Sequence, residues 1–169
     1  MNQSPVSEPT DSAYGRRDFY RKRYGLPASV EPYANRIVVK VGVIAAITMP
    51  EPLGGRVLDA LTARGTATGP IILHTHSRRW TFLLEPDIPF EDYELYAEMY
   101  RRSVTIAPIG ASVALPAPTD PEDGYRVWKQ LPPSDSRPSA ALVIELIRDF
   151  ARQHYLSAGA DLAAPDEVN

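Results

Sequence analysis

The strand-forming segments of this chain lie close together along the sequence, joined by only a few residues, and this spacing constrains the fold most. β-branched and aromatic residues indicate strands at 36–41, 43–49, 71–74, 80–84, 104–107, 112–115 and 125–129. Gly42, between the first two, suggests a bend, a bulge or a tight turn. Because short links favour antiparallel pairing of neighbours, we expect a mainly antiparallel sheet and not a doubly wound parallel one.

Helix signals separate these strands. Ser12 is a candidate N-cap for a helix that ends at Tyr24, and proline opens a second helix at about residue 51. A third helix over 91–102 has acids in its first turn and arginines in its last, and a long final helix covers about 138–155. The order of elements predicts an α+β fold, with a mainly antiparallel sheet and helices packed on one of its faces.

We expect a single domain with short tails. The polar, proline-containing segment 1–11 is predicted to be a flexible N-terminal arm, and 157–169 an acidic flexible tail. Residues 12–156 are the predicted α+β domain. The size is that of one ordinary domain, since the chain has 169 residues.

Composition and charge exclude several classes of protein. There is no cysteine, which excludes a disulfide scaffold, a thiolate zinc site and a cysteine nucleophile. No apolar run approaches the ~18 residues of a membrane span, and no signal peptide is evident, so we expect a cytoplasmic protein without a membrane partner. A net charge of −3 is unlike that of a strongly basic nucleic-acid coat protein.

The sequence gives little indication of catalysis or of a metal. On a strand, His74 and His76 would share a face, as two metal ligands could. A third ligand would have to come from elsewhere, from His154 or from a carboxylate such as Asp87 or Asp120, and nothing in the sequence spacing indicates that any of them lies nearby. The strand-forming stretch 36–49 contains no acid, and no GxSxG or GxGxxG motif is present. We therefore predict no catalytic residue, no metal site and no cofactor.

Cations alternate with aromatic residues in two predicted strands, and these residues are the candidate binding site for nucleic acid or a partner protein. They are Arg78, Arg79, Trp80, Arg126, Trp128 and Lys129. Such interleaving can bind single strands by base stacking and phosphate contact. In the other interpretation the tryptophans belong to the core and arginine stems cover its edge. On the second strand, Arg126 and Trp128 should face one way, and Tyr125, Val127 and Lys129 the other.

Five stretches of the chain resemble small actinobacterial proteins labelled "DNA-directed RNA polymerase subunit beta". They are GLPASVEP (25–32), ITMPE (47–51), GPII (69–72), SRRWTFL (77–83) and GYRVW (124–128). The resemblance covers about three quarters of the chain, from Gly25 to Phe150, and implies a role near transcription. A genuine β subunit is several times longer, and none of its active-centre segments is recognisable here.

A looser resemblance is to the bifunctional primase–polymerase domain, whose outline is similar over Gly69–Leu84 and Pro108–Ile147. Trp80 stands about where that family carries a histidine, and the acids that hold its metal ions have no counterpart in 36–49. The resemblance therefore implies a non-catalytic relative, and no site residue is carried over.

We expect a non-catalytic intracellular binding or accessory module whose partner is nucleic acid or a protein of the transcription or replication machinery. Two alternatives stay open. One is an active nucleotidyltransferase. The other is a pure protein-interaction subunit that uses the first helix, which is basic, or the stripe of Tyr93, Tyr96 and Tyr100.

Overall fold

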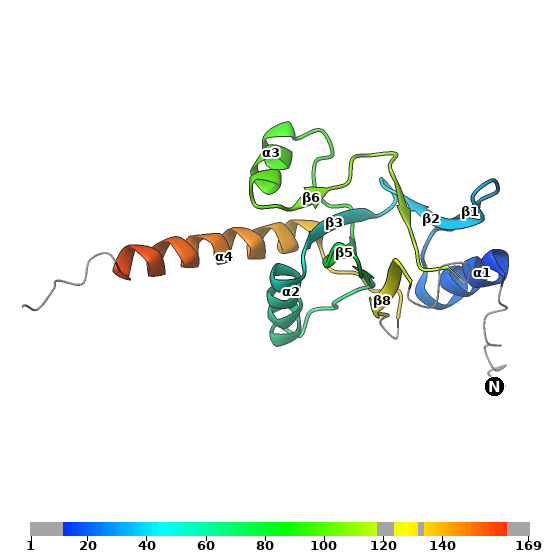
Figure 1. The fold of residues 1–169 in the computed structure, drawn as a ribbon, viewed down its shortest axis with the longest axis horizontal. Helices are drawn as coiled ribbons and strands as arrows, with labels where there is room; N and C mark the ends of the chain where they lie inside the picture. The colour runs from blue at the N-terminus through cyan, green and yellow to red at the C-terminus, as the bar shows by residue number, and fades with distance from the viewer. Residues whose placement is uncertain (1–11, 118–123, 132–133, 162–169) are drawn as a thin grey trace, which may run out of the picture.

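Two antiparallel sheets and four helices form an α+β fold, as predicted (Figure 1). The computed structural model describes residues 12–117, 124–131 and 134–161, with side chains through His154. The helices are α1 (Ala13–Tyr24), α2 (Glu51–Ala63), α3 (Tyr93–Arg101) and α4 (Ala140–Asp161). The strands are β1 (Ala28–Glu31), β2 (Arg36–Lys40), β3 (Ala45–Pro50), β4 (Ile71–His74), β5 (Arg79–Leu84), β6 (Thr105–Ile106), β7 (Ser112–Ala114) and β8 (Arg126–Gln130). The predicted arm at 1–11 lies outside the described residues.

The larger sheet has five strands in the order β6-β3-β5-β4-β8, and the smaller has three in the order β1-β2-β7. The central pair of the larger sheet, β3 and β5, is in register from Ala45 opposite Leu84 to Pro50 opposite Arg79. The predicted hairpin of β4 and β5 is confirmed, with His74 opposite Arg79 where the loop begins and ends. β1, which pairs with β2, is a strand that the sequence analysis did not predict.

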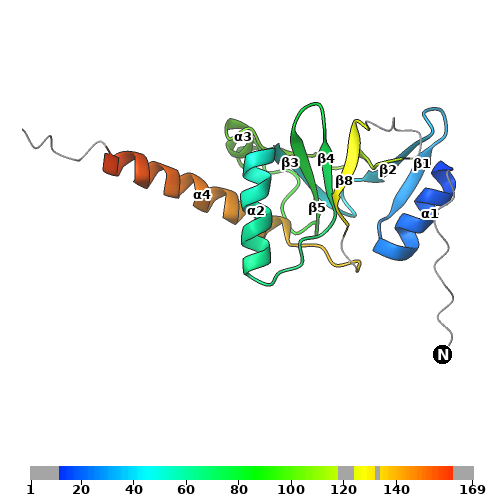
Figure 2. The same cartoon turned by 60° about the horizontal axis from the view of Figure 1, so that its bottom comes forward.

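Both faces of the five-stranded sheet are covered, so the expectation of helices on one face was wrong. One face packs through Ile47 and Phe82 against α2, α3 and α4, and the other packs through Ala46 and Leu83 against α1 and the smaller sheet. Figure 2 shows α2 and α1 on either side of these strands. The reason lies in runs such as Phe82-Leu83-Leu84: successive side chains point to opposite faces, so a continuous apolar run requires burial on both.

Gly42 directs the chain from one sheet to the other. The prediction that 36–41 and 43–49 pair as neighbours was wrong, because β2 belongs to the small sheet and β3 to the large one. Gly42 has φ of 124°, a backbone conformation that side-chain-bearing residues rarely adopt. The returning chain crosses at the same place, where Val41 exchanges two backbone hydrogen bonds with Gly110 and Ala111. The two crossings therefore stabilise each other.

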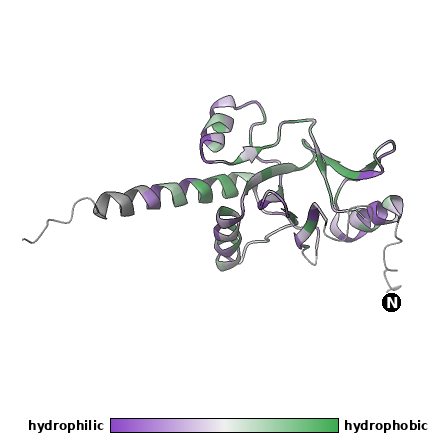
Figure 3. Cartoon of the chain, viewed as in Figure 1, coloured by the Kyte–Doolittle hydropathy of each residue, from purple (hydrophilic) through white to green (hydrophobic). Residues whose placement is uncertain are grey.

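The final helix leaves the body of the molecule. The first turns of α4 bury Val143, Ile144 and Ile147 against the large sheet, and the helix then extends away on the side opposite α1 (Figure 1). Its sheet-facing start is hydrophobic in Figure 3, whereas α1 is largely hydrophilic. α4 ends at Asp161, so it continues through the predicted domain boundary at 156. Residues 162–169 of the predicted acidic tail lie outside the described residues.

No helix in the described part of the chain is both long enough and apolar enough to cross a lipid bilayer.

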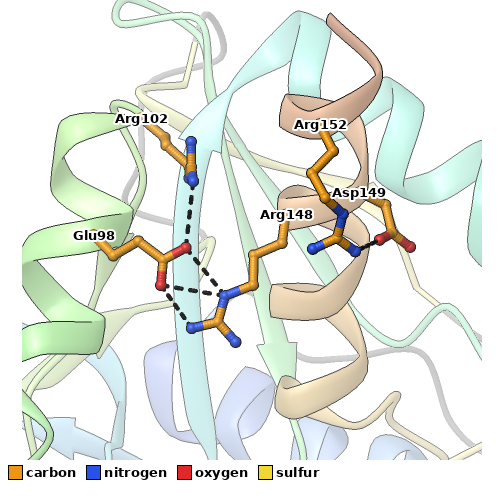
Figure 4. A network of polar contacts seen from close by, with 5 residues as sticks. All are labelled: Glu98, Arg102, Arg148, Asp149 and Arg152. Carbon is orange, nitrogen blue, oxygen red and sulfur yellow. Dashed lines mark hydrogen bonds and ion pairs between the residues drawn. The ribbon is translucent and has the colours of Figure 1, made fainter. Parts of the chain in front are cut away.

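A charged network joins α3 to α4. Arg148 of α4 donates from Nε and Nη2 to the Glu98 carboxylate of α3, with a shortest distance of 2.6 Å (Figure 4). Arg102 reaches the same carboxylate at 3.4 Å. The hydrogen bonds from Arg148 hold the pKa of the Glu98 carboxyl below its usual value. Arg152, one turn further along α4, pairs with Asp149 of its own helix (Figure 4).

We expect Arg148→Met to lower the free energy of unfolding by about 1 kcal/mol, because it removes a two-point ion pair between helices. Arg152→Met is the matched control on the same helix. It should change stability by less than half as much, since its partner is local and more exposed. Urea denaturation of both variants tests this, and equal losses would contradict it.

Two adjacent glycines in α2 have opposite surroundings. A Cβ at Gly54 would lie 2.8 Å from Cε3 of Trp80, so the helix packs directly on the indole ring. A Cβ at Gly55 would meet no atom within 4 Å. Gly54 is therefore needed for close approach to the sheet, whereas Gly55 contributes only a weak helix propensity.

We predict that Gly54→Ala destabilises the protein by about 1–3 kcal/mol through overpacking against the buried Trp80. Gly55→Ala should instead stabilise it by about 0.5–1 kcal/mol, because alanine favours the helix. Thermal denaturation of the pair measures the difference directly. If both variants changed stability in the same direction, the contact with Trp80 would not be what requires glycine at position 54.

Candidate nucleic-acid interface

The two tryptophans of the predicted site lie on opposite faces of the large sheet. Trp80 is 5% exposed and packs in the core beneath α2, and the Lys129 ammonium lies 5.0 Å from its ring centre. Trp128 is partly buried on the other face, where its Nε1 donates to the hydroxyl of Tyr20 at 2.9 Å. Trp80 is a buried core residue, whereas Trp128 is partly buried and packs against the core on the opposite face. They therefore do not form a shared stacking platform.

The predicted cations separate into two groups. The Arg78 side chain is 80% exposed, lies in the β4–β5 loop and contacts Glu51 at 3.1 Å. Arg126 and Trp128 face one side of β8 and Val127 the other, as predicted, because they stand opposite His74, Ile72 and Leu73 of β4. Arg78 and Arg126 are thus at the hairpin end of the sheet. Lys129 lies further along β8, on the face of Trp80.

An exposed aromatic pair that the sequence analysis did not select lies at this hairpin end. Tyr125, just before β8, is 56% exposed, and its ring centre is 4.6 Å from that of His76 in the loop. We call His76, Arg78, Tyr125 and Arg126 the hairpin-end surface. One sequence signal could have identified Tyr125 as exposed: it lies next to the cation Arg126, at the start of β8, the strand that follows β4 at the edge of the large sheet.

The loop and β8 are fixed to each other. Thr75 donates from its backbone N–H to the carbonyl of Tyr125 at 3.3 Å, and from its hydroxyl to the carbonyl of Gly124 at 2.9 Å. β4 ends at His74, so His76 belongs to the loop and does not share a strand face with His74. The shared strand face that a metal site would need is therefore not formed by these two imidazoles.

A hollow of about 330 Å³ adjoins this surface, between the large sheet and β7. Its floor is formed by Thr48, His74, Arg79 and Thr81 of three neighbouring strands, and we call it the threonine hollow. The remaining lining residues are Ala46, Ser77, Ala107, Ser112, Val113 and Ala114. The hollow occupies the face that carries Ala46, Ile72 and Leu83, beyond the point where these apolar residues end.

A chain of hydrogen bonds crosses the floor of the hollow. Nε2 of His74 lies 2.7 Å from Oγ1 of Thr81, which lies 2.7 Å from Oγ1 of Thr48. If Nε2 carries the proton, His74 donates to Thr81 and Thr81 donates to Thr48. The Thr48 hydroxyl is then free to donate into the hollow.

Arg79 contributes the positive charge of the hollow and also holds the sheet together. Its Nη2 donates to the carbonyls of Thr48 at 3.2 Å and Ser103 at 2.7 Å. Its Nε and Nη1 atoms have no protein partner among the described residues, and no described carboxylate pairs with it. The half-buried guanidinium can therefore still donate to an anion.

His74 is kept neutral by its surroundings. Burial lowers the pKa of its imidazole below the usual 6.5, and the positive charges of Arg126 and Arg79 lower the pKa further. At neutral pH the ring therefore carries one proton and can either donate to Thr81 or accept from it. A negative charge in the hollow would oppose the lowering of the His74 pKa by Arg126 and Arg79.

This depressed pKa predicts how stability depends on pH. The unfolded chain binds a proton at His74 near pH 6.5 and the folded chain only at lower pH, so acidification through that interval favours unfolding. One proton can change the free energy of unfolding by at most about 1.4 kcal/mol per pH unit. We expect His74→Gln to lose less stability than the wild type between about pH 7.5 and 5. Urea titrations across this range test it, and parallel curves would contradict it.

Among the described residues, no three histidine or acidic side chains gather closely enough to hold a metal ion. His74 and His76 are engaged separately, by Thr81 and by Tyr125. Asp120, one of the three further ligands considered from the sequence, lies outside the described residues.

No protein-family model, no curated protein and no solved structure matches this chain. The resemblances to the polymerase-labelled group and to the primase–polymerase domain therefore stay predictions. What the site can bind is argued below from its own geometry.

Proposed function

We propose that this chain is a non-catalytic module that binds single-stranded nucleic acid at the hairpin-end surface. The observation that carries the proposal is the exposed Tyr125 ring, paired with His76 and flanked by Arg78 and Arg126. An exposed ring can stack on any base, and neighbouring guanidiniums can contact the phosphates. Stacking and phosphate contact are the two requirements for binding single-stranded nucleic acid without preference for its base sequence.

Two further features support the proposal. Net charge is −3 for the whole chain, so binding has to come from local clustering of cations. Two cations are close together here, because Arg79 in the adjoining hollow and Arg126 of β8 both act on His74. Nucleotidyl transfer, the enzymatic alternative, uses carboxylates to hold metal ions, and none is among the described residues that line the hollow.

As part of the same proposal, we place the module in the cytoplasm, in contact with strands exposed during transcription or replication. The resemblance to the polymerase-labelled group supports this context. The resemblance to the primase–polymerase domain, without its acids, supports binding in place of catalysis.

We expect Tyr125→Ala to weaken the binding of a labelled single-stranded DNA by about 1–3 kcal/mol, the contribution of one stacked base. Fluorescence anisotropy at two salt concentrations measures it. Arg78→Asn should lower the dependence of binding on salt concentration by the equivalent of about one phosphate contact. Asparagine is chosen because it tolerates the backbone conformation at this position, where φ is 50°.

Tyr93→Ala is the matched control, since Tyr93 is 81% exposed on α3, outside the hairpin-end surface. It should bind DNA like the wild type. If Tyr125→Ala also binds like the wild type, the hairpin-end surface is not the site.

A protein-interaction subunit is the second candidate, and exposed tyrosines on α3 favour it. Tyr93 and Tyr100 are seven residues apart on one side of the helix and are 81% and 76% exposed. Tyr96, between them, instead donates its hydroxyl to the carbonyl of Phe90. Absence of DNA binding by the wild type at low salt, where electrostatic attraction is strongest, would favour this candidate.

A further inference from the structure

We propose that the threonine hollow binds a phosphate monoester, the terminal phosphate of a single-stranded nucleic acid. This inference rests on the proposed function and names the part of the ligand that the hollow would hold. It comes from four properties of the hollow: its free donors, its charge, its access to solvent and its position beside the hairpin-end surface.

The hollow offers several donors to an anion. Nε and Nη1 of Arg79 are unused by the described protein atoms, and the Thr48 hydroxyl can donate when His74 donates to Thr81. Ser112 accepts from the Lys40 ammonium at 2.6 Å, and its hydroxyl also hydrogen-bonds the Glu31 carboxylate, so it is not among the donors available to an anion. Ser77 contributes another hydroxyl. Hydroxyls and guanidinium nitrogens are the donors that phosphate oxygens accept from.

The charge around the hollow is also suited to an anion. No aspartate or glutamate is among the described residues that line the hollow, and the Glu31 carboxylate hydrogen-bonds Ser112 at its edge. The charged groups that act on His74 are Arg126 of β8 and Arg79 of β5, both positive. A bound dianion would therefore meet attraction from both arginines, and it would make protonation of His74 easier. Protonated His74 donates to Thr81, and Thr81 can then donate to Thr48, so ligand and proton would bind together.

The hollow is open to solvent, with the face of the large sheet on one side and Ser112, Val113 and Ala114 of β7 on another, so the end of a strand can reach it. The number of phosphate oxygens then favours a terminal phosphate. A monoester has three terminal oxygens that can accept hydrogen bonds from the hollow, whereas an internal phosphodiester has two.

The hollow and the hairpin-end surface share the β4–β5 loop. Ser77 lines the hollow, and its neighbours in the chain are His76 and Arg78 of the hairpin-end surface. A volume of about 330 Å³ lies at the lower end of the range for ligand pockets, which suits one phosphate with its first sugar. A strand could thus stack a base on Tyr125 and place its terminal phosphate in the hollow.

The test compares oligonucleotides of one sequence that carry a 5′-phosphate, a 3′-phosphate or hydroxyls at both ends. By fluorescence anisotropy at fixed ionic strength, we expect one phosphorylated end to bind about tenfold tighter, the effect of a hydrogen bond to a charged group. Thr48→Val removes the hydroxyl and keeps the volume. It should abolish this preference and leave the affinity for the hydroxyl-ended strand unchanged.

Thr62→Val is the matched control, because the Thr62 hydroxyl donates to the carbonyl of Leu58 within α2, away from the hollow. It should keep the preference. Arg79→Gln, checked for folding because Arg79 also binds two carbonyls, should lose it. Equal affinity for all three oligonucleotides overturns the inference and leaves the proposed function intact. A preference that persists in both Thr48→Val and Arg79→Gln overturns it as well.

Titration with adenosine 5′-monophosphate and with adenosine, followed by NMR amide shifts of Ser77 and Ser112, separates a strand end from a free nucleotide. Shifts with the monophosphate alone support a monoester site. If no oligonucleotide binds at all, the proposed function fails, and this titration then decides the inference by itself. Absence of shifts with either compound overturns it.

Discussion

Burial of the five-stranded sheet from both sides is the constraint on which the other features of the structure depend. β4 and β5 carry large apolar side chains on both faces, and each such side chain contributes about 1.5–3 kcal/mol when it is fully buried. One sheet face therefore requires the helices, and the other requires α1 and a second sheet. To build that second sheet, the chain passes from it into the large sheet at Gly42 and goes back to it after Gly110. The polar floor of the threonine hollow lies where this second covering ends.

Local features of the sequence predicted the local structure well. The hairpin of β4 and β5, the N-cap at Ser12 and the polarity of charges along α3 all follow from interactions between residues near in sequence. The distribution of strands over two sheets could not be predicted in this way, because it depends on which distant strands meet. The run Phe82-Leu83-Leu84 did contain a relevant signal, since an unbroken apolar strand requires cover on both faces. The end of α4 at Asp161 was also missed, because the sequence analysis ended this helix at about residue 155.

The candidate site shows the same limit. Alternation along β8 correctly placed Arg126 and Trp128 on one face, because that depends only on strand geometry. The burial of Trp80 could not be settled by its own neighbours, since the cover comes from Gly54 of α2, 26 positions earlier in the chain. Thr48, His74 and Thr81 come from three strands, and only their register brings them into one row. A site made by register across strands has no continuous motif that a single sequence could reveal.

The two hydrogen bonds of Thr75 have a consequence for the kinetics of binding. They attach the loop that carries His76 to the strand that begins beside Tyr125, so the two rings belong to one rigid body in the free protein. Under the proposed function, a base that arrives would find a platform already assembled, and no loop would have to be ordered at the moment of contact. Encounter would then be limited by diffusion and electrostatic attraction, and affinity would be set by how long the base stays stacked.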